Sequence, residues 1–191
     1  MRRLPTVLTP KLRSRFRGHE GGASAVEFGI LAFPFLLLLL AILEIAMTFW
    51  STQFLETAVA DASRKIYTGQ FQQDPANKNL TPEQLRVKIK GEICAYVTVL
   101  FKCETLVSVD VQTFDNNTNA AALSNPVDAN GKYDTSGYAY RKPEPKQITI
   151  VRASMEYPVL VTMLSRPGAL ANGNRLIVAA ATFRTEPYTT N

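Results

Sequence analysis

The 191-residue sequence has little of what most enzymes and metal proteins need. Its one histidine, His19, lies in a basic segment close to the N-terminus. A histidine-based catalytic triad and a site with several histidine ligands are therefore excluded for the residues that follow. The sequence also lacks the phosphate-binding GxxxxGK[ST], dinucleotide-binding GxGxxG and zinc-protease HExxH patterns. We expect no cofactor, no metal site and no catalytic residue.

Cysteine is scarce as well, with only Cys94 and Cys103. Two cysteines with no nearby histidine argue against a metal site, which leaves a disulfide or two separate buried thiols. If one helix ran through both cysteines, its rise would separate their Cα atoms by about 13.5 Å. A disulfide needs less than about 7 Å. We predict the disulfide, and with it a helix that ends between Val97 and Lys102.

Charge is missing from one long stretch of the sequence. Between Phe28 and Leu55 the only charged residue is Glu44. A helix needs about 20 residues to cross the hydrocarbon core of a bilayer, so residues 28–50 are long enough to span it. The alternative is a buried helix of a soluble protein. Five consecutive leucines at 36–40 argue against this, because they make the helix apolar on all sides.

Glu44 lies about 25 Å beyond Glu27 if both belong to one helix. We expect Glu44 to reach the far interface of the membrane, where Phe49 and Trp50 would form an aromatic belt. A buried Glu44 that pairs with another subunit is the alternative.

Positive charge is concentrated ahead of the apolar stretch. Six of the 21 Lys and Arg precede it against one acid, whereas the other 15 are diluted by 12 acids after Glu56. The positive-inside rule therefore predicts a single-pass protein of the inner (cytoplasmic) membrane with a cytoplasmic N-terminus and a periplasmic body from Thr57 onward. Membrane lipid is an expected partner, and the adjacent span argues against nucleic acid as the target of the basic segment. An exported body also suits a disulfide.

Three interpretations of the N-terminus compete. A secretory signal peptide would have an apolar core of about 7–15 residues and an A-x-A-like cleavage site. Here the apolar stretch is longer and no convincing site follows. An uncleaved anchor fits the length but gives no reason for Gly21, Gly22 and Glu27. The third interpretation accounts for all three residues, because GASAVEF at 22–28 resembles the processing site of type IV prepilins and pseudopilins.

In that family a membrane-bound prepilin peptidase cuts after the glycine, and the fifth residue of the mature chain is a glutamate. The resemblance implies cleavage between Gly22 and Ala23, which makes Glu27 the fifth residue. It also implies that Glu27 and Phe28 take part in subunit assembly, with Glu27 pairing with the free N-terminal ammonium of a neighbouring subunit. The alternative is a Glu27 that merely lies among the lipid headgroups.

Hydrophobic periodicity predicts α+β structure after the span. An apolar stripe at helical spacing predicts one helix from about residue 23 to residue 67, with Gly69 as its stop. Thr81 caps a second helix that begins at Pro82. The sequence TLVSVDVQTF from Thr105 alternates as a half-buried strand, and further strands are expected at about 147–157 and 175–185. Residues 115–146 are polar and rich in Asn, Gly and Pro, which predicts a long loop with room for a short hairpin.

These elements predict a membrane-anchored α+β protein in three parts. A basic cytoplasmic leader covers 1–22, and a transmembrane and stalk helix covers 23–69. An exported head covers 70–191, in which one helix packs on a small antiparallel sheet.

Several segments together resemble TadE-like proteins, the pilin-like minor components of the tight-adherence (Flp) pilus machinery. They are AVEF at 25–28, the apolar run with Glu44, QFLETAVADASRK at 53–65 and ATFRTEPY at 181–188. The resemblance implies a non-enzymatic minor subunit, or pseudopilin, that assembles with other pilin-like subunits and pilus assembly proteins through its N-terminal helix. The alternative is a membrane-anchored periplasmic enzyme or binding protein with an uncleaved anchor. Its catalysis would need a Ser-Lys or paired-carboxylate site, which the sequence does not exclude.

Overall fold

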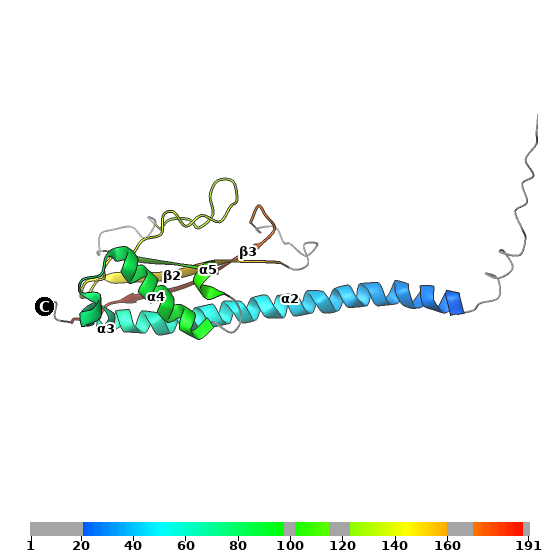
Figure 1. Cartoon of the computed structure of the whole chain (residues 1–191), viewed down its shortest axis with the longest axis horizontal. Helices are drawn as coiled ribbons and strands as arrows, with labels where there is room; N and C mark the ends of the chain where they lie inside the picture. Colours follow the sequence, from blue (N-terminus) through cyan, green and yellow to red (C-terminus); the bar gives the residue numbers. More distant parts are fainter. Residues whose placement is uncertain (1–20, 98–101, 115–122, 160–169, 189–191) are drawn as a thin grey trace, which may run out of the picture. The chain divides into compact units, whose positions relative to one another are not determined.

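The computed structural model describes residues 21–97, 102–114, 123–159 and 170–188. One very long helix is followed by short helices and a three-stranded sheet (Figure 1). The elements in chain order are α2 (Gly21–Tyr67), α3 (Gln70–Gln73), the 3-10 helix η1 (Pro75–Asn77), α4 (Pro82–Val97), α5 (Cys103–Leu106), β1 (Val107–Phe114), β2 (Ile148–Tyr157) and β3 (Arg175–Arg184). The expected α+β fold class is confirmed.

The chain divides into two compact units within α2, between Leu43 and Glu44. The first unit contains the N-terminal half of α2. The second, Glu44–Asn191, contains the C-terminal half of α2 and all the remaining elements. We call this second unit the head.

The glycine at position 69 accounts for the end of α2 and for the turn that follows it. Gly69 adopts a left-handed φ of 77°, and its N–H donates to the carbonyl of Ile66 at 3.1 Å. A Cβ on Gly69 would also lie 2.5 Å from the Tyr188 ring, so both the backbone and the packing require glycine here. The helix therefore stops where the sequence predicted.

The predicted cap of α4 is a complete capping box. The Thr81 N–H donates to Gln84 Oε1 at 2.8 Å, and the Gln84 N–H donates to Thr81 Oγ1 at 3.3 Å. Pro82 occupies the first helical position, where its missing N–H costs nothing. These contacts fix the start of α4 at the predicted residue.

The sheet is antiparallel, with β2 in the centre and β1 and β3 on either side. Val107 pairs with Met155 and Ile148 pairs with Arg184, which sets the register of both strand pairs. The outer edge of β1 is covered by the loop that follows it. There the Val111 N–H donates to Ala139 O at 2.9 Å, and the Arg141 N–H donates to Val111 O at 2.8 Å.

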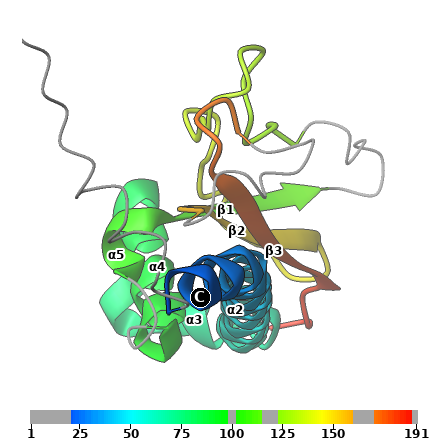
Figure 2. The same cartoon turned by 90° about the vertical axis from the view of Figure 1, so that its right-hand side faces the viewer.

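One hydrophobic core fills the head between the helices and one face of the sheet (Figure 2). The C-terminal half of α2 contributes its apolar stripe to this core, so two helices rather than α4 alone cover the sheet. The core residues from these three sources include Leu55, Val59, Ala62 and Ile66 of α2, Leu85, Ile89 and Ile93 of α4, and Val107, Val109, Val111, Val151, Ala153, Met155 and Ile177 of the sheet.

The first strand begins later than the sequence predicted. We expected it to start at Thr105, but Thr105 and Leu106 belong to α5. The hydroxyl and N–H of Thr105 both donate to Lys102 O, at 3.0 and 3.1 Å, and the Leu106 N–H donates to the same oxygen at 3.2 Å. Such local bonds compete with strand pairing and close a helical turn instead.

The predicted disulfide joins Cys94 and Cys103 and is confirmed. Their Cα atoms lie 5.4 Å apart, within the range that a disulfide needs. The helix α4 ends at Val97, as the distance argument required, and Cys103 opens α5. Both cysteines are buried, so the bridge ties α4 to the start of the sheet from inside the core.

Replacing both cysteines by alanine should lower the free energy of unfolding by about 2.7 kcal/mol, because the bridge closes a loop of about ten residues. Urea unfolding of the full-length protein in detergent measures the loss. A reductant should destabilise the wild type but leave Cys94→Ala/Cys103→Ala unchanged. Two free thiols in protein isolated without reductant would contradict the bridge.

Candidate functional site

The sequence-predicted site residues lie together at the start of α2. Gly22, Ala23, Glu27 and Phe28 fall within its first two turns, so the structure places them on one regular helix. Gly22, Glu27 and Phe28 are exposed. The surface that follows consists of large apolar side chains, and Phe28 itself is 73% exposed.

Nothing in the packing explains a glycine at position 22. A Cβ added there would meet no atom within 4 Å, and the residue lies in helical backbone. The described part of the chain therefore gives no packing reason for a glycine at this position.

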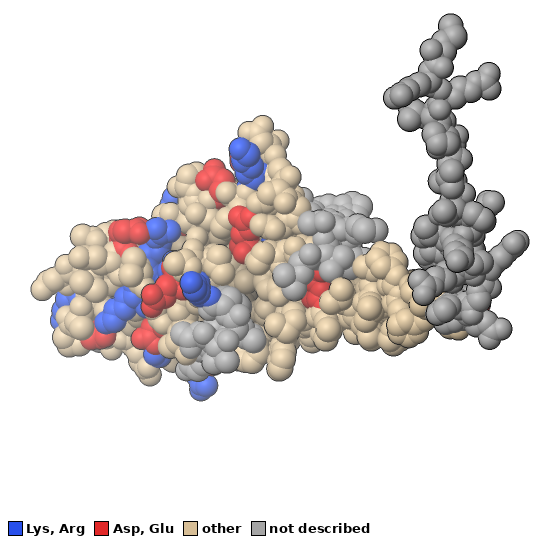
Figure 3. All heavy atoms as spheres, turned by 45° about the vertical axis from the view of Figure 1, so that its right-hand side comes forward, with Lys and Arg blue, Asp and Glu red and all other residues tan. Residues whose placement is uncertain are grey.

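Glu27 interrupts an otherwise uncharged surface. Within the described residues the structure gives its carboxylate no hydrogen bond or ion pair. The next charged residue along α2 is Glu44. On the face seen in Figure 3, charged side chains are concentrated on the head, and the N-terminal stretch of α2 is almost entirely uncharged.

Among the described residues, one helix is long and apolar enough to cross a membrane, and its candidate span is Ser24–Tyr67. Pro34 lies inside it. Proline breaks helices in water but is tolerated in membrane-spanning ones. The length, composition and N-terminal position of this helix indicate a single-pass membrane anchor.

Glu44 is buried against the head, whereas its expected depth at the far membrane interface stays a prediction. Its side chain is 4% exposed, and the hydroxyl of Thr48 donates to its backbone carbonyl at 2.8 Å. Glu44 is the first member of the stripe that α2 buries in the head, which continues through Ser51 to Leu55. Phe49 and Trp50, by contrast, are exposed.

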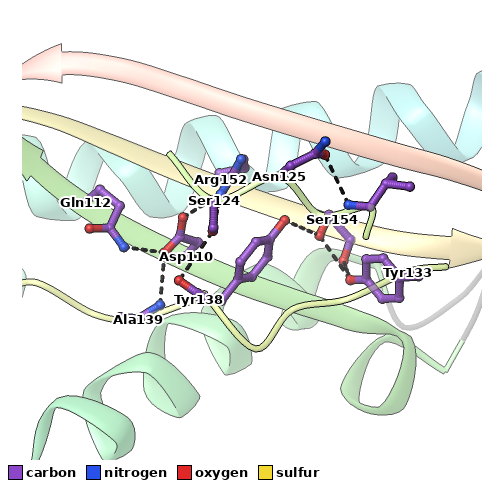
Figure 4. A network of polar contacts seen from close by, with 11 residues as sticks. Asp110, Gln112, Ser124, Asn125, Tyr133, Tyr138, Ala139, Arg152 and Ser154 are labelled. Atoms are coloured by element: carbon purple, nitrogen blue, oxygen red, sulfur yellow. Dashed lines mark hydrogen bonds and ion pairs between the residues drawn. The ribbon is translucent and has the colours of Figure 1, made fainter. Parts of the chain in front are cut away.

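A second group of polar residues lies on the sheet face opposite the core (Figure 4). Arg152 of β2 donates from Nη2 to Asp110 Oδ2 of β1 at 2.8 Å, and both side chains are buried. The other carboxylate oxygen of Asp110 accepts from the Ala139 N–H at 3.0 Å and from Gln112 Nε2 at 2.7 Å. Arg152 also donates to Ser124 Oγ at 3.2 Å. The ion pair thus binds the loop to the sheet at two points.

Two tyrosines of the loop complete this network. The guanidinium carbon of Arg152 lies 4.8 Å from the centre of the Tyr138 ring, which is within the range of a cation–π contact. Tyr138 and Tyr133 place their hydroxyls 2.7 and 3.0 Å from Ser154 Oγ. Burial raises the pKa of Tyr138, so its hydroxyl stays neutral and cannot act as a base toward Ser154. The arrangement anchors the loop to the sheet.

The sequence did not reveal this network. The alternation in β1 predicted that Asp110 faces solvent, but it is 1% exposed because the loop covers this face as well. The available signal was the pairing of an acid and a base on adjacent strands, since Asp110 and Arg152 are register partners. The part of the loop at 115–122 lies outside the described residues. At 123–146 the expected hairpin is reduced to an isolated antiparallel bridge between Val127 and Tyr133.

Comparison with models of known protein families gives a match on the N-terminal helix. The family model of TadE-like proteins matches residues 22–64, all within α2. This segment is TadE-like. No curated protein and no solved structure matches the chain.

The TadE-like match confirms the resemblance found in the sequence and covers Gly22, Glu27 and Glu44. The match does not extend beyond α2 into the rest of the head. Among the described residues no group of His, Cys, Asp and Glu could hold a metal ion.

Replacing Asp110 by alanine should destabilise the head by about 3–5 kcal/mol, because it leaves the charge of Arg152 buried without its partner. Urea unfolding of the full-length protein measures this, and proteolysis should become faster within 123–141. Glu83→Ala is the matched control, since Glu83 forms an exposed ion pair with Arg86. That change should cost about 1 kcal/mol or less. Equal stability of the two variants would contradict a loop anchored by Asp110.

Proposed function

We propose that this chain is a pilin-like minor subunit, a pseudopilin, that takes part in assembly of a tight-adherence pilus. The observation that carries the proposal is the position of the family match. It begins at Gly22, the residue after which a prepilin peptidase would cut, and runs through the exposed apolar surface of α2.

Processing after Gly22 would explain a glycine that the fold does not need. It would also remove the charge imbalance of the chain. The sequence up to residue 22 holds six of the 21 Lys and Arg but only one of the 16 Asp and Glu. The remainder then has 15 residues of each sign. The basic leader would serve to hold the N-terminus in the cytoplasm, with the head on the periplasmic side of the inner membrane.

Processing would also give Glu27 a partner. The new ammonium on Ala23 lies one helical turn before Glu27, at the cytoplasmic edge of the membrane. At 4 Å and an effective dielectric constant of 20, the two charges attract by about 4 kcal/mol before desolvation. A carboxylate near the hydrocarbon is costly without such a partner. If the ammonium belongs to a neighbouring subunit, the pair sets the register between adjacent helices.

The alternative, a membrane-anchored periplasmic enzyme or binding protein, predicts a different pattern of loss. It would fail when a polar cluster of the head is changed, whereas an assembly subunit fails at Gly22 and Glu27. In the described part of the head, the buried serine, tyrosines and ion pair serve to hold a loop. They give the enzyme no support.

The mature protein should begin at Ala23 in cells with an active prepilin peptidase. Intact-mass measurement of the membrane-extracted protein detects the loss of residues 1–22. Gly22→Leu should block cleavage, because a bulky side chain replaces the glycine at the cut. Gly29→Leu is a matched control, since a Cβ at Gly29 also meets nothing within 4 Å. Intact Met1 in wild-type protein from such cells would contradict the proposal.

Glu27→Gln should leave membrane insertion normal but strongly reduce pilus formation, because it keeps the size of the side chain and removes its charge. Insertion is measured by membrane fractionation, and piliation by electron microscopy. Glu56→Gln provides the control, since Glu56 is an exposed carboxylate of the same helix whose recorded contact is with Gln53. Normal piliation of Glu27→Gln would show that the carboxylate has no role in register.

A further inference from the structure

The stretch of α2 from Glu44 to Leu55 belongs to the head on one side and carries an apolar surface on the other. Glu44, Ser51 and Leu55 are buried. The opposite side carries large apolar side chains that are between 37% and 66% exposed, namely Ile45, Phe49, Trp50 and Phe54. We call these four residues the aromatic face. A monomeric domain in water rarely leaves such a surface uncovered.

The hydroxyl groups of this stretch have hydrogen-bond acceptors within the helix, so they do not need water as a partner. Thr48, Ser51 and Thr52 each donate their hydroxyl to the backbone carbonyl four residues earlier, at 2.8, 2.8 and 2.9 Å. Hydroxyl groups satisfied in this way are compatible with an apolar environment. No charged residue occurs between Glu44 and Glu56. The change to a water-facing surface comes only there, where Gln53 donates to the Glu56 carboxylate at 3.0 Å.

We infer that the aromatic face lies in the lipid headgroup layer, so that the head rests directly on the membrane surface. The face continues the apolar surface of the membrane-spanning part of the same helix without a charged residue between Glu44 and Phe54. Trp50 and Phe54 contact each other with ring centroids 6.1 Å apart. Aromatic rings, and tryptophan above all, are enriched at this depth because they present both an apolar body and a polar edge.

The stretch is long enough to cross the headgroup layer completely. Glu44 to Phe54 covers about 15 Å of helical rise. A headgroup layer is only about 5–7 Å thick on each side of the hydrocarbon core. In an upright helix the Ile45 end of the aromatic face therefore lies inside the hydrocarbon, Phe49 and Trp50 lie at headgroup depth, and the Phe54 end lies at the water boundary. Glu44, at the deeper end, is screened from lipid by its burial in the head.

Trp50 is the only tryptophan of the chain, so its fluorescence reports on this surface directly. The full-length protein is reconstituted in phosphatidylcholine–phosphatidylglycerol vesicles whose acyl chains carry bromine at a shallow or a deep position. We expect strong quenching that is greater for shallow than for deep bromine, together with weak quenching by aqueous acrylamide. The matched control is Trp50→Phe/Val87→Trp, which moves the reporter to an exposed position on α4. The control should show several-fold weaker quenching by brominated lipid and several-fold stronger quenching by acrylamide.

Two results would overturn the inference. Strong acrylamide quenching of Trp50 without lipid quenching would place the aromatic face in water. Protection from both quenchers, lost as the protein is diluted with lipid, would show that a second copy of the chain covers it. The inference rests on the single-span anchor and not on processing or pilus assembly. Because the experiment needs neither peptidase nor pilus, its failure would leave the proposed function standing.

Discussion

The apolar stripe of α2 in the head is the contact on which the rest of the structure depends. Leu55, Val59, Ala62 and Ile66 face α4 and the inner side of the sheet, and all four are buried in one core. The sheet cannot cover this stripe alone, so α4 must be held against it. The capping box fixes where α4 begins, and the disulfide fixes how the chain returns from its end to β1. The capping box and the disulfide each restrict the conformation of one segment that connects α4 to the rest of the head.

The N-terminal half of the same helix has the composition of a membrane-spanning segment. For this reason few of its side chains are polar or charged. On a membrane-spanning helix, only the few residues that are not large and apolar can point to a specific function. In this chain they include Gly22, Glu27 and Pro34. Among the described residues the glycine has no packing neighbour and the carboxylate has no partner, which supports the proposal that both act through molecules outside the folded chain.

Much of this structure follows from local sequence, because the controlling signals span only a few residues. The Thr81–Gln84 cap and the stop at Gly69 each depend on about one turn of chain, and the two cysteines are nine residues apart. Thr105 was assigned wrongly because its hydroxyl competes locally with strand pairing. The solvent exposure expected of Asp110 was wrong for a different reason. Its burial depends on a segment distant in the sequence, and alternation cannot indicate what will cover a side chain.

The buried network of Asp110, Arg152 and the two tyrosines clarifies the role of the long loop. A covered ion pair and neutral tyrosine hydroxyls favour a loop that is held in one conformation over a reactive site. This agrees with a subunit whose head presents a shape to its partners while its helix joins the assembly.

The central claim is that the processed end of α2 contacts other subunits. The most direct test places a photo-crosslinking amino acid at Phe28 in piliated cells, in strains with and without active prepilin peptidase. Our account predicts crosslinks to pilin-like subunits that depend on the active peptidase. Crosslinks that are identical in both strains, or that join the residue to lipid alone, would contradict it.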